Sequence, residues 1–142
     1  MKLNKKLLVL LSVGLLFSAN SFARDTVHHL PIKDVFDMPE AKQKLDPSIK
    51  FYFGQSVNGN IVKTDSTNKK TNAFNKSDEQ ACRWSMLSAL IQMQKRAQQL
   101  GVKKISNVVS YYKKQPYKST SLYECHAGAV MAGVAIKGDF VK

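Results

Sequence analysis

The clearest pattern of apolar and polar positions lies between Ser77 and Gly101. Apolar residues recur there at intervals of three and four, which predicts a helix with one core-facing side. Ser77 and Gln80 have the spacing of a capping box, and Gly101 is typical of the residue that ends a helix. We therefore predict an amphipathic helix over about 78–100, whose apolar side carries Cys82, Met86, Ala89, Leu90, Met93, Ala97 and Leu100.

Shorter patterns on both sides of this helix predict strands and a weaker helix. Residues 26–32, 49–53 and 105–112 are rich in β-branched or aromatic residues and predict strands. Residues 34–45 predict a short helix, with Pro39 in the first turn of its regular part. The run 121–136 is apolar and rich in alanine and glycine, so we expect a final strand that lets the long helix pack closely.

The segment 55–76 is polar and rich in turn-forming residues. It predicts a loop with a tight turn at Asn58-Gly59 and, at most, a short returning strand over 61–64. Its last part leads into the helix N-terminus, a position suited to binding an anion. The candidate ligand-binding residues are Asn68, Lys69, Lys70, Asn72, Asn75, Lys76 and Ser77. The alternative is a plain polar connection whose asparagines bond their own backbone.

These elements predict one α+β domain over residues 24–142. We expect a small antiparallel or mixed sheet, with the long helix and a shorter helix packed on one face. The chain after residue 23 has the length of a single domain with a modest core.

Residues 1–23 have the pattern of a secretory signal peptide. A basic start precedes the apolar run LLVLLSVGLLF, and the small residues Ser21 and Ala23 mark a cleavage site. The run is too short for a comfortable membrane span, and no cysteine follows the cut to carry a lipid anchor. We therefore expect an exported periplasmic protein with no lipid anchor and no transmembrane segment after signal removal. The alternative is an uncleaved N-terminal anchor.

The chain is strongly basic. Loss of Lys2, Lys5 and Lys6 with the signal would take the formal net charge from +12 to +9, because all ten acidic residues remain. This balance favours anionic partners such as lipid head groups or glycans. Export makes nucleic acid an unsuitable partner, and evenly spread, solvated lysines are the alternative explanation.

The two cysteines, Cys82 and Cys125, favour a disulfide, because an even count is typical of small exported domains. Two buried free thiols are the alternative. Cys125 beside His126 and His28 beside His29 hint at metal ligands, but neighbours on a strand point to opposite faces. His126 stays a weak candidate ligand, and we predict no cofactor.

No catalytic motif is complete. Gly54 and Gly59 have the spacing of a phosphate-binding loop, but Asn60 and Ile61 stand where the lysine and the hydroxyl residue belong. A nucleophile at Cys125 would need a free, partly ionised thiol. We therefore predict a protein that is not an enzyme.

From Cys82 to Ile136 the chain resembles the domain shared by the envelope stress lipoprotein RcsF and the YbjQ group, notably at YECHAGAVMAGVAIKGDF. It is more similar still to small exported proteins labelled excinuclease ATPase subunits, at LPI, PEAK, KFYFG, NKKTNAFNKSDE, SYYKK and ECHAGA. The resemblance implies an α+β sheet under the long helix and a bridge between Cys82 and Cys125. A second bridge of RcsF-like proteins would fall near Ser110 and Met131 and is absent. The ATPase label does not fit, because the chain lacks the phosphate-binding lysine and is too short.

Together these observations lead to two hypotheses. The first is a non-catalytic accessory or sensing module of the periplasm that binds an envelope protein or an anionic envelope component. The second is a periplasmic protein that binds a small ligand, an anion or a metal, through the segment 68–77 or His126.

Overall fold

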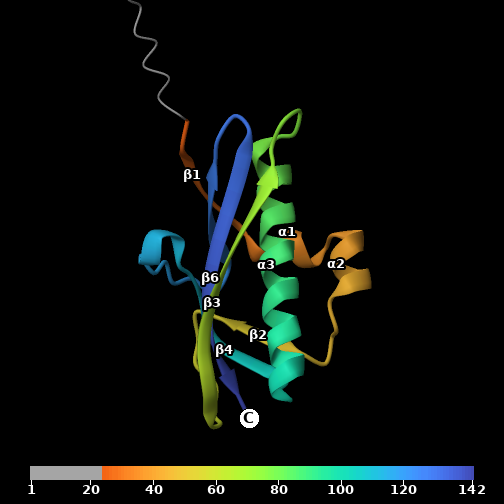
Figure 1. Ribbon diagram of the computed structural model, residues 1–142, viewed down its shortest axis with the longest axis vertical. Helices are drawn as coiled ribbons and strands as arrows, with labels where there is room; N and C mark the ends of the chain where they lie inside the picture. The colour runs from red at the N-terminus through yellow and green to blue at the C-terminus, as the bar shows by residue number, and fades with distance from the viewer. Residues whose placement is uncertain (1–23) are drawn as a thin grey trace, which may run out of the picture.

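The computed structural model describes residues 24–142, so the predicted signal peptide, residues 1–23, lies outside the described residues. Residues 24–142 form six strands and three α-helices, which alternate irregularly along the sequence (Figure 1). The elements are β1 (Thr26–Pro31), α1 (Ile32–Phe36), α2 (Pro39–Lys44), β2 (Lys50–Phe53), β3 (Ile61–Asn72), α3 (Asp78–Leu100), β4 (Lys104–Ser110), a 3₁₀ turn η1 (Tyr112–Lys114), β5 (Leu122–Ala127) and β6 (Met131–Val141).

The C-terminal strand β6 is the centre of the sheet. It pairs with β3 along one side over its full length, and on the other side with β5 near its start and β4 near its end. Strand β1 then pairs antiparallel with β5, and β2 pairs parallel with β4. Helix α3 covers one face of the β3–β6 pair, and α1 and α2 lie beside α3 (Figure 1). The predicted α+β fold, with a mixed sheet, one long helix and shorter helices, is confirmed.

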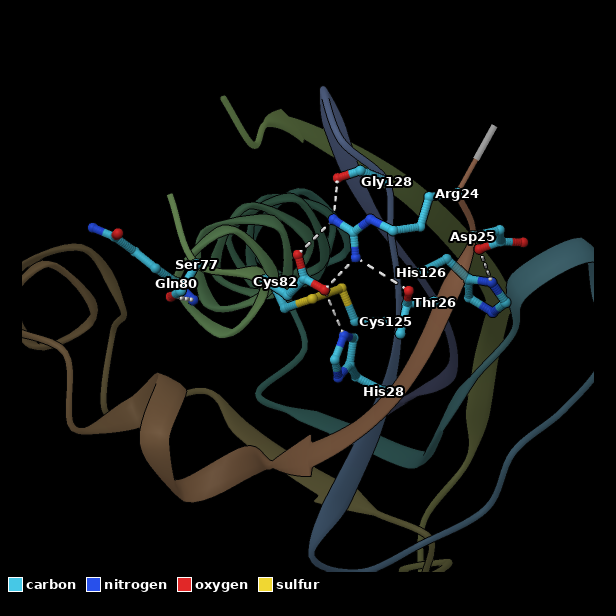
Figure 2. A network of polar contacts seen from close by, with 11 residues as sticks. Arg24, Asp25, Thr26, His28, Ser77, Gln80, Cys82, Cys125, His126 and Gly128 are labelled. Carbon is cyan, nitrogen blue, oxygen red and sulfur yellow. Dashed lines mark hydrogen bonds and ion pairs between the residues drawn. A yellow bond between two sulfur atoms is a disulfide. The ribbon is translucent and has the colours of Figure 1, made fainter. Parts of the chain in front are cut away.

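Helix α3 has the predicted bounds, ends and buried side. Ser77 Oγ accepts a hydrogen bond from the Gln80 backbone N–H at 3.1 Å, and Gly101 takes the left-handed conformation with φ of 67°. The Gln80 side chain extends away from Ser77, so only one half of the capping box forms (Figure 2). The predicted apolar side is buried throughout, apart from the half-buried Leu100.

The interpretation of residues 55–76 as a loop was wrong. Asn58-Gly59 is a bend, but residues 61–72 form one strand, β3, which pairs with β6 and not with β2. Half of its twelve residues are lysine, asparagine or aspartate, which are depleted in strands. β3 nevertheless forms because β6 offers it a complete ladder of hydrogen bonds, while its outer face stays in water.

Two other predictions need correction. The run 121–136 is two antiparallel strands, β5 and β6, and the chain turns at residues 128–130. Residues 34–45 form two short helices and not one, and α1 already begins at Ile32. The break falls just before Pro39, which starts α2 as predicted, because proline lacks the N–H that a continuous helix would need.

One buried side chain ties α2 to α3. Gln94, on α3, accepts a hydrogen bond from the Asp46 N–H at 2.6 Å and donates one to the Lys44 carbonyl at 3.0 Å. These two bonds satisfy backbone groups at the C-terminal end of α2, where a helix has no partners of its own. The position of α2 therefore depends on Gln94.

Replacing Gln94 with leucine is expected to lower the free energy of unfolding by about 1 kcal/mol, because two partly buried backbone groups lose their partners. Urea denaturation measures this change. Gln98→Leu is the matched control, since Gln98 is exposed on the same helix, and it should shift stability by less than about 0.5 kcal/mol. Equal effects of the two substitutions would mean that the Gln94 hydrogen bonds do not matter.

No helix within residues 24–142 is both long enough and apolar enough to cross a membrane.

Candidate functional site

Exposed apolar side chains lie where two connecting segments meet at one end of the molecule. The β3–α3 connection and the β5–β6 turn lie together there, at the top of Figure 1. They are joined by a hydrogen bond of 2.7 Å from the Ala73 N–H to the Val130 carbonyl. Phe74, Val130 and Met131 expose 66%, 61% and 45% of their surface. We call these three residues the apolar tip; neighbouring exposed apolar residues are typical of interaction surfaces.

Two lysines flank the apolar tip. Lys70 lies on β3 opposite Gly133, two positions before Asn72, which pairs with Met131. Lys76 lies in the β3–α3 connection and donates to the Asn72 carbonyl at 3.0 Å. Both are exposed. The tip therefore combines apolar side chains with positive charge.

A bidentate ion pair fixes the segments behind the tip. The Arg24 guanidinium donates to both carboxylate oxygens of Asp78, at 2.7 and 2.9 Å, and to the Gly128 carbonyl at 2.9 Å (Figure 2). The His28 ring nitrogen Nε2 also lies 2.8 Å from Asp78 Oδ2. Asp78 is the first residue of α3, and Gly128 begins the β5–β6 turn. Arg24 thus links the N-terminal segment, the helix start and the turn.

The Asp78 carboxylate is held in its charged form. Its hydrogen bonds from Arg24, and then from His28, lower the pKa of Asp78 well below its usual range. The N-terminal end of α3 adds a positive potential at the same place. Both carboxylate oxygens of Asp78 already accept hydrogen bonds from Arg24. We therefore assign Asp78 a structural role.

The predicted disulfide lies directly beneath this pair. Cys82 on α3 and Cys125 on β5 are bonded, with their Cα atoms 5.9 Å apart, and both are fully buried. The bond joins the first turns of the helix to the β1–β5 side of the sheet (Figure 2). No cysteine is free within residues 24–142, so the alternative of a Cys125 nucleophile lacks its thiol.

A groove of about 650 Å³ runs from the tip along the outer face of the sheet. We call it the outer groove; it is lined by Arg24, Asp25, Lys70, Tyr112, His126 and residues 128–133. Lys70 on β3 and His126 on β5 both pair with Gly133 on β6, so these three residues lie on the same face of the sheet. The Tyr112 and His126 rings stack at 3.5 Å on the β5 side of the groove. The groove can therefore take a planar or anionic group near Lys70.

The side chains around His126 do not form a metal site in the part of the chain that the structure describes. Its Nδ1 contacts Asp25 at 2.9 Å and its Nε2 contacts Glu124 at 3.2 Å, while Glu124 also reaches His29 at 3.3 Å. His28 faces Asp78 on the other side of the strand, as the alternation of neighbours predicted. In the part of the chain that the structure describes, no group of three or more possible ligands is placed to hold a metal ion.

The seven candidate ligand-binding residues do not form one loop. Asn68, Lys70 and Asn72 lie on the outer face of β3, whereas Lys69 lies on the face toward α3. Asn75, Lys76 and Ser77 follow in the connection, and the Asn72 side chain accepts from the Phe74 N–H at 2.7 Å. Of the seven, only Lys70 lines the outer groove, and Lys76 stands beside the tip.

Sequence reasoning missed Arg24, Phe74, Val130 and Met131. Phe74 could have been recognised from the sequence, because it is the one large apolar residue in the polar run NKKTNAFNK and so indicates either burial or a contact surface. Arg24 carried none, since its partner Asp78 is 54 positions away. Val130 and Met131 were hidden by the interpretation of 121–136 as one strand.

No family model, no curated protein and no solved structure matches the chain.

Proposed function

We propose that this chain is a non-catalytic accessory or sensing module of the periplasm that binds an envelope partner through its apolar tip. The partner is an envelope protein or an anionic envelope component. The observation that carries the proposal is the tip itself, three exposed apolar side chains flanked by Lys70 and Lys76 on a rigid support. Interfaces typically place such anchors at their centre and charges at their rim.

Three further properties support the proposal. The disulfide is typical of proteins that fold in an oxidising compartment. The predicted net charge of +9 after signal removal favours an anionic partner. The disulfide and the Arg24–Asp78 pair order the tip before binding, which lowers the entropic cost of forming an interface.

Site-specific photo-crosslinking in cells tests the proposal. A photoreactive residue at position 74 or 130 is expected to give crosslinked adducts that one at position 61 or 62 does not. Ile61 and Val62 are matched controls, since they are also exposed apolar residues, 59% and 45% exposed, at the opposite end of β3. Adducts of the same kind and yield from both ends would contradict the proposal.

Substitution of the apolar tip residues should reduce recovery of the crosslinked partner. Phe74→Ser with Val130→Ser is expected to lower recovery of the position-specific partner at least tenfold, because truncating two anchors costs more than about 1.4 kcal/mol of binding energy. Ile61→Ser with Val62→Ser should leave recovery unchanged. Sedimentation with vesicles of phosphatidylglycerol, against phosphatidylcholine alone, separates an anionic lipid surface from a protein partner.

The outer groove favours a second candidate, a periplasmic protein that binds a small anion. Lys70 and the Tyr112–His126 stack face the same space. Thermal shift with phosphate and with planar aromatic carboxylates tests this, because a ligand at a hundred times its Kd stabilises by about 2.7 kcal/mol. Lys70→Ala should remove the shift, while a flat series would exclude this candidate.

A further inference from the structure

A second groove lies between the short helices α1 and α2 and the edge strand β2. None of its lining residues belongs to the apolar tip. We call it the aromatic groove. It has a volume of about 490 Å³, within the range of small-molecule sites. Its lining is mostly apolar and includes Ile32, Phe36, Leu45, Ile49, Phe51 and Phe53.

Three phenylalanines form the most prominent part of this lining. Phe36 comes from α1, and Phe51 and Phe53 lie two positions apart on β2, so they share a face. Each pair of rings has centroids 6.2 Å apart. All three remain half-buried, so part of their apolar surface faces the water in the groove. An apolar occupant would remove that surface from water, which is favourable.

The mouth of the groove is positively charged. Lys42 and Lys50 line it and are exposed, and neither forms an ion pair within residues 24–142. Lys103 lies beside them and donates to Ser48 at 3.2 Å. Asp46 is the one carboxylate among the lining residues, and its Oδ1 accepts a hydrogen bond from the Ser48 N–H at 2.8 Å. An anionic head group would therefore meet unpaired lysines.

We propose that the aromatic groove binds a fatty-acid anion, with the acyl chain against the phenylalanines and the carboxylate at Lys42 and Lys50. Charge complementarity at the mouth favours an acid over a neutral chain, and the mostly apolar lining favours an acyl chain over a polar ligand. This site does not depend on the apolar tip, so it stands apart from the proposed function. Gln94 holds α2, one wall of the groove, in position.

Isothermal titration of the folded protein with octanoate, decanoate and dodecanoate, each below its micelle concentration, tests the acyl chain. Affinity is expected to rise about threefold to fourfold for each added methylene until the groove is filled, as expected for burial of a CH₂ group. An affinity independent of chain length would overturn the proposal.

The head group is tested with substitutions at the mouth. Lys42→Ala with Lys50→Ala is expected to weaken decanoate binding about fivefold, the value of two exposed charge pairs, and to leave decanol binding unchanged. Lys63→Ala with Lys118→Ala is the matched control, because these lysines are also exposed but do not line the groove. Equal loss in both double variants would exclude recognition at the mouth.

Chemical-shift mapping with decanoate locates the site. The amide signals of Phe36, Leu45 and Phe53 are expected to move. Shifts confined to Phe74, Val130 and Met131 would show that the acyl chain binds the tip and would overturn the proposal for the groove. The Phe74→Ser, Val130→Ser variant should keep decanoate binding, which separates this result from the test of the envelope partner.

Discussion

Reduction of the Cys82–Cys125 disulfide is expected to lower the free energy of unfolding by about 4 kcal/mol. The cysteines are 43 positions apart, and a cross-link over such a loop removes about that much conformational entropy from the unfolded chain in the chain-entropy model. The expected loss is a large part of the total stability of a domain of this size. Urea denaturation of the oxidised and the reduced protein measures it, since both forms have the same side chains.

The control is the double variant Cys82→Ala, Cys125→Ala. Its stability should not change when reductant is added, whereas the native chain should become less stable. A difference below about 1 kcal/mol between the oxidised and reduced native chain would contradict the expected contribution of the loop. Reduction should also lower crosslinking from position 74, because the bond joins the start of α3 to β5 behind the tip.

Local signals in the sequence predicted the parts of the fold that depend on local physics. Helix α3 has its cap, its ending glycine and its apolar side within one segment, so its bounds followed from residues 77–101 alone. Strand β2 and strand β4 followed from their β-branched and aromatic residues. The disulfide followed from cysteine count and expected compartment, with free thiols left open.

Strand β3 could not be predicted in this way, because its strand character comes from its partner. Thr67 and Lys69 face α3 only because β6 places them there, opposite Ile136 and Val134. The turn between β5 and β6 was equally hidden. Its residues Gly128, Ala129 and Val130 lack the asparagine–glycine pattern of a tight hairpin.

The candidate ligand-binding residues of the sequence analysis and the apolar tip lie at the same end of α3. The β3–α3 connection does stand at the Ser77 end, and Lys70 and Lys76 lie near the tip. Its apolar members come from segments that are distant in sequence, Phe74 from one connection and Val130 and Met131 from another. Only the tertiary fold joins them, so composition alone indicated a basic loop and not an apolar tip with a basic flank.

Replacing Asp78 with asparagine is expected to lower the free energy of unfolding by about 1–2 kcal/mol at neutral pH. The substitution removes the charge that accepts from Arg24 and His28, and hydrogen bonds to charged groups contribute more than neutral ones. Partial exposure of Arg24 keeps the value at the lower end. Glu79→Gln is the matched control, because Glu79 lies in the same helical turn and forms no ion pair within the described residues.

The effect should depend on pH in one direction. The pKa of Asp78 is lower in the folded protein than in the unfolded chain, so the native state binds fewer protons at this group. Its contribution is complete above the unfolded value of about 4 and is lost as the pH falls through the lowered folded value. Denaturation curves between about pH 7 and pH 2 should therefore show the native chain and Asp78→Asn converging in acid. A constant difference would mean that Asp78 acts by shape and not by charge, and the Arg24 contact would then not order the tip electrostatically.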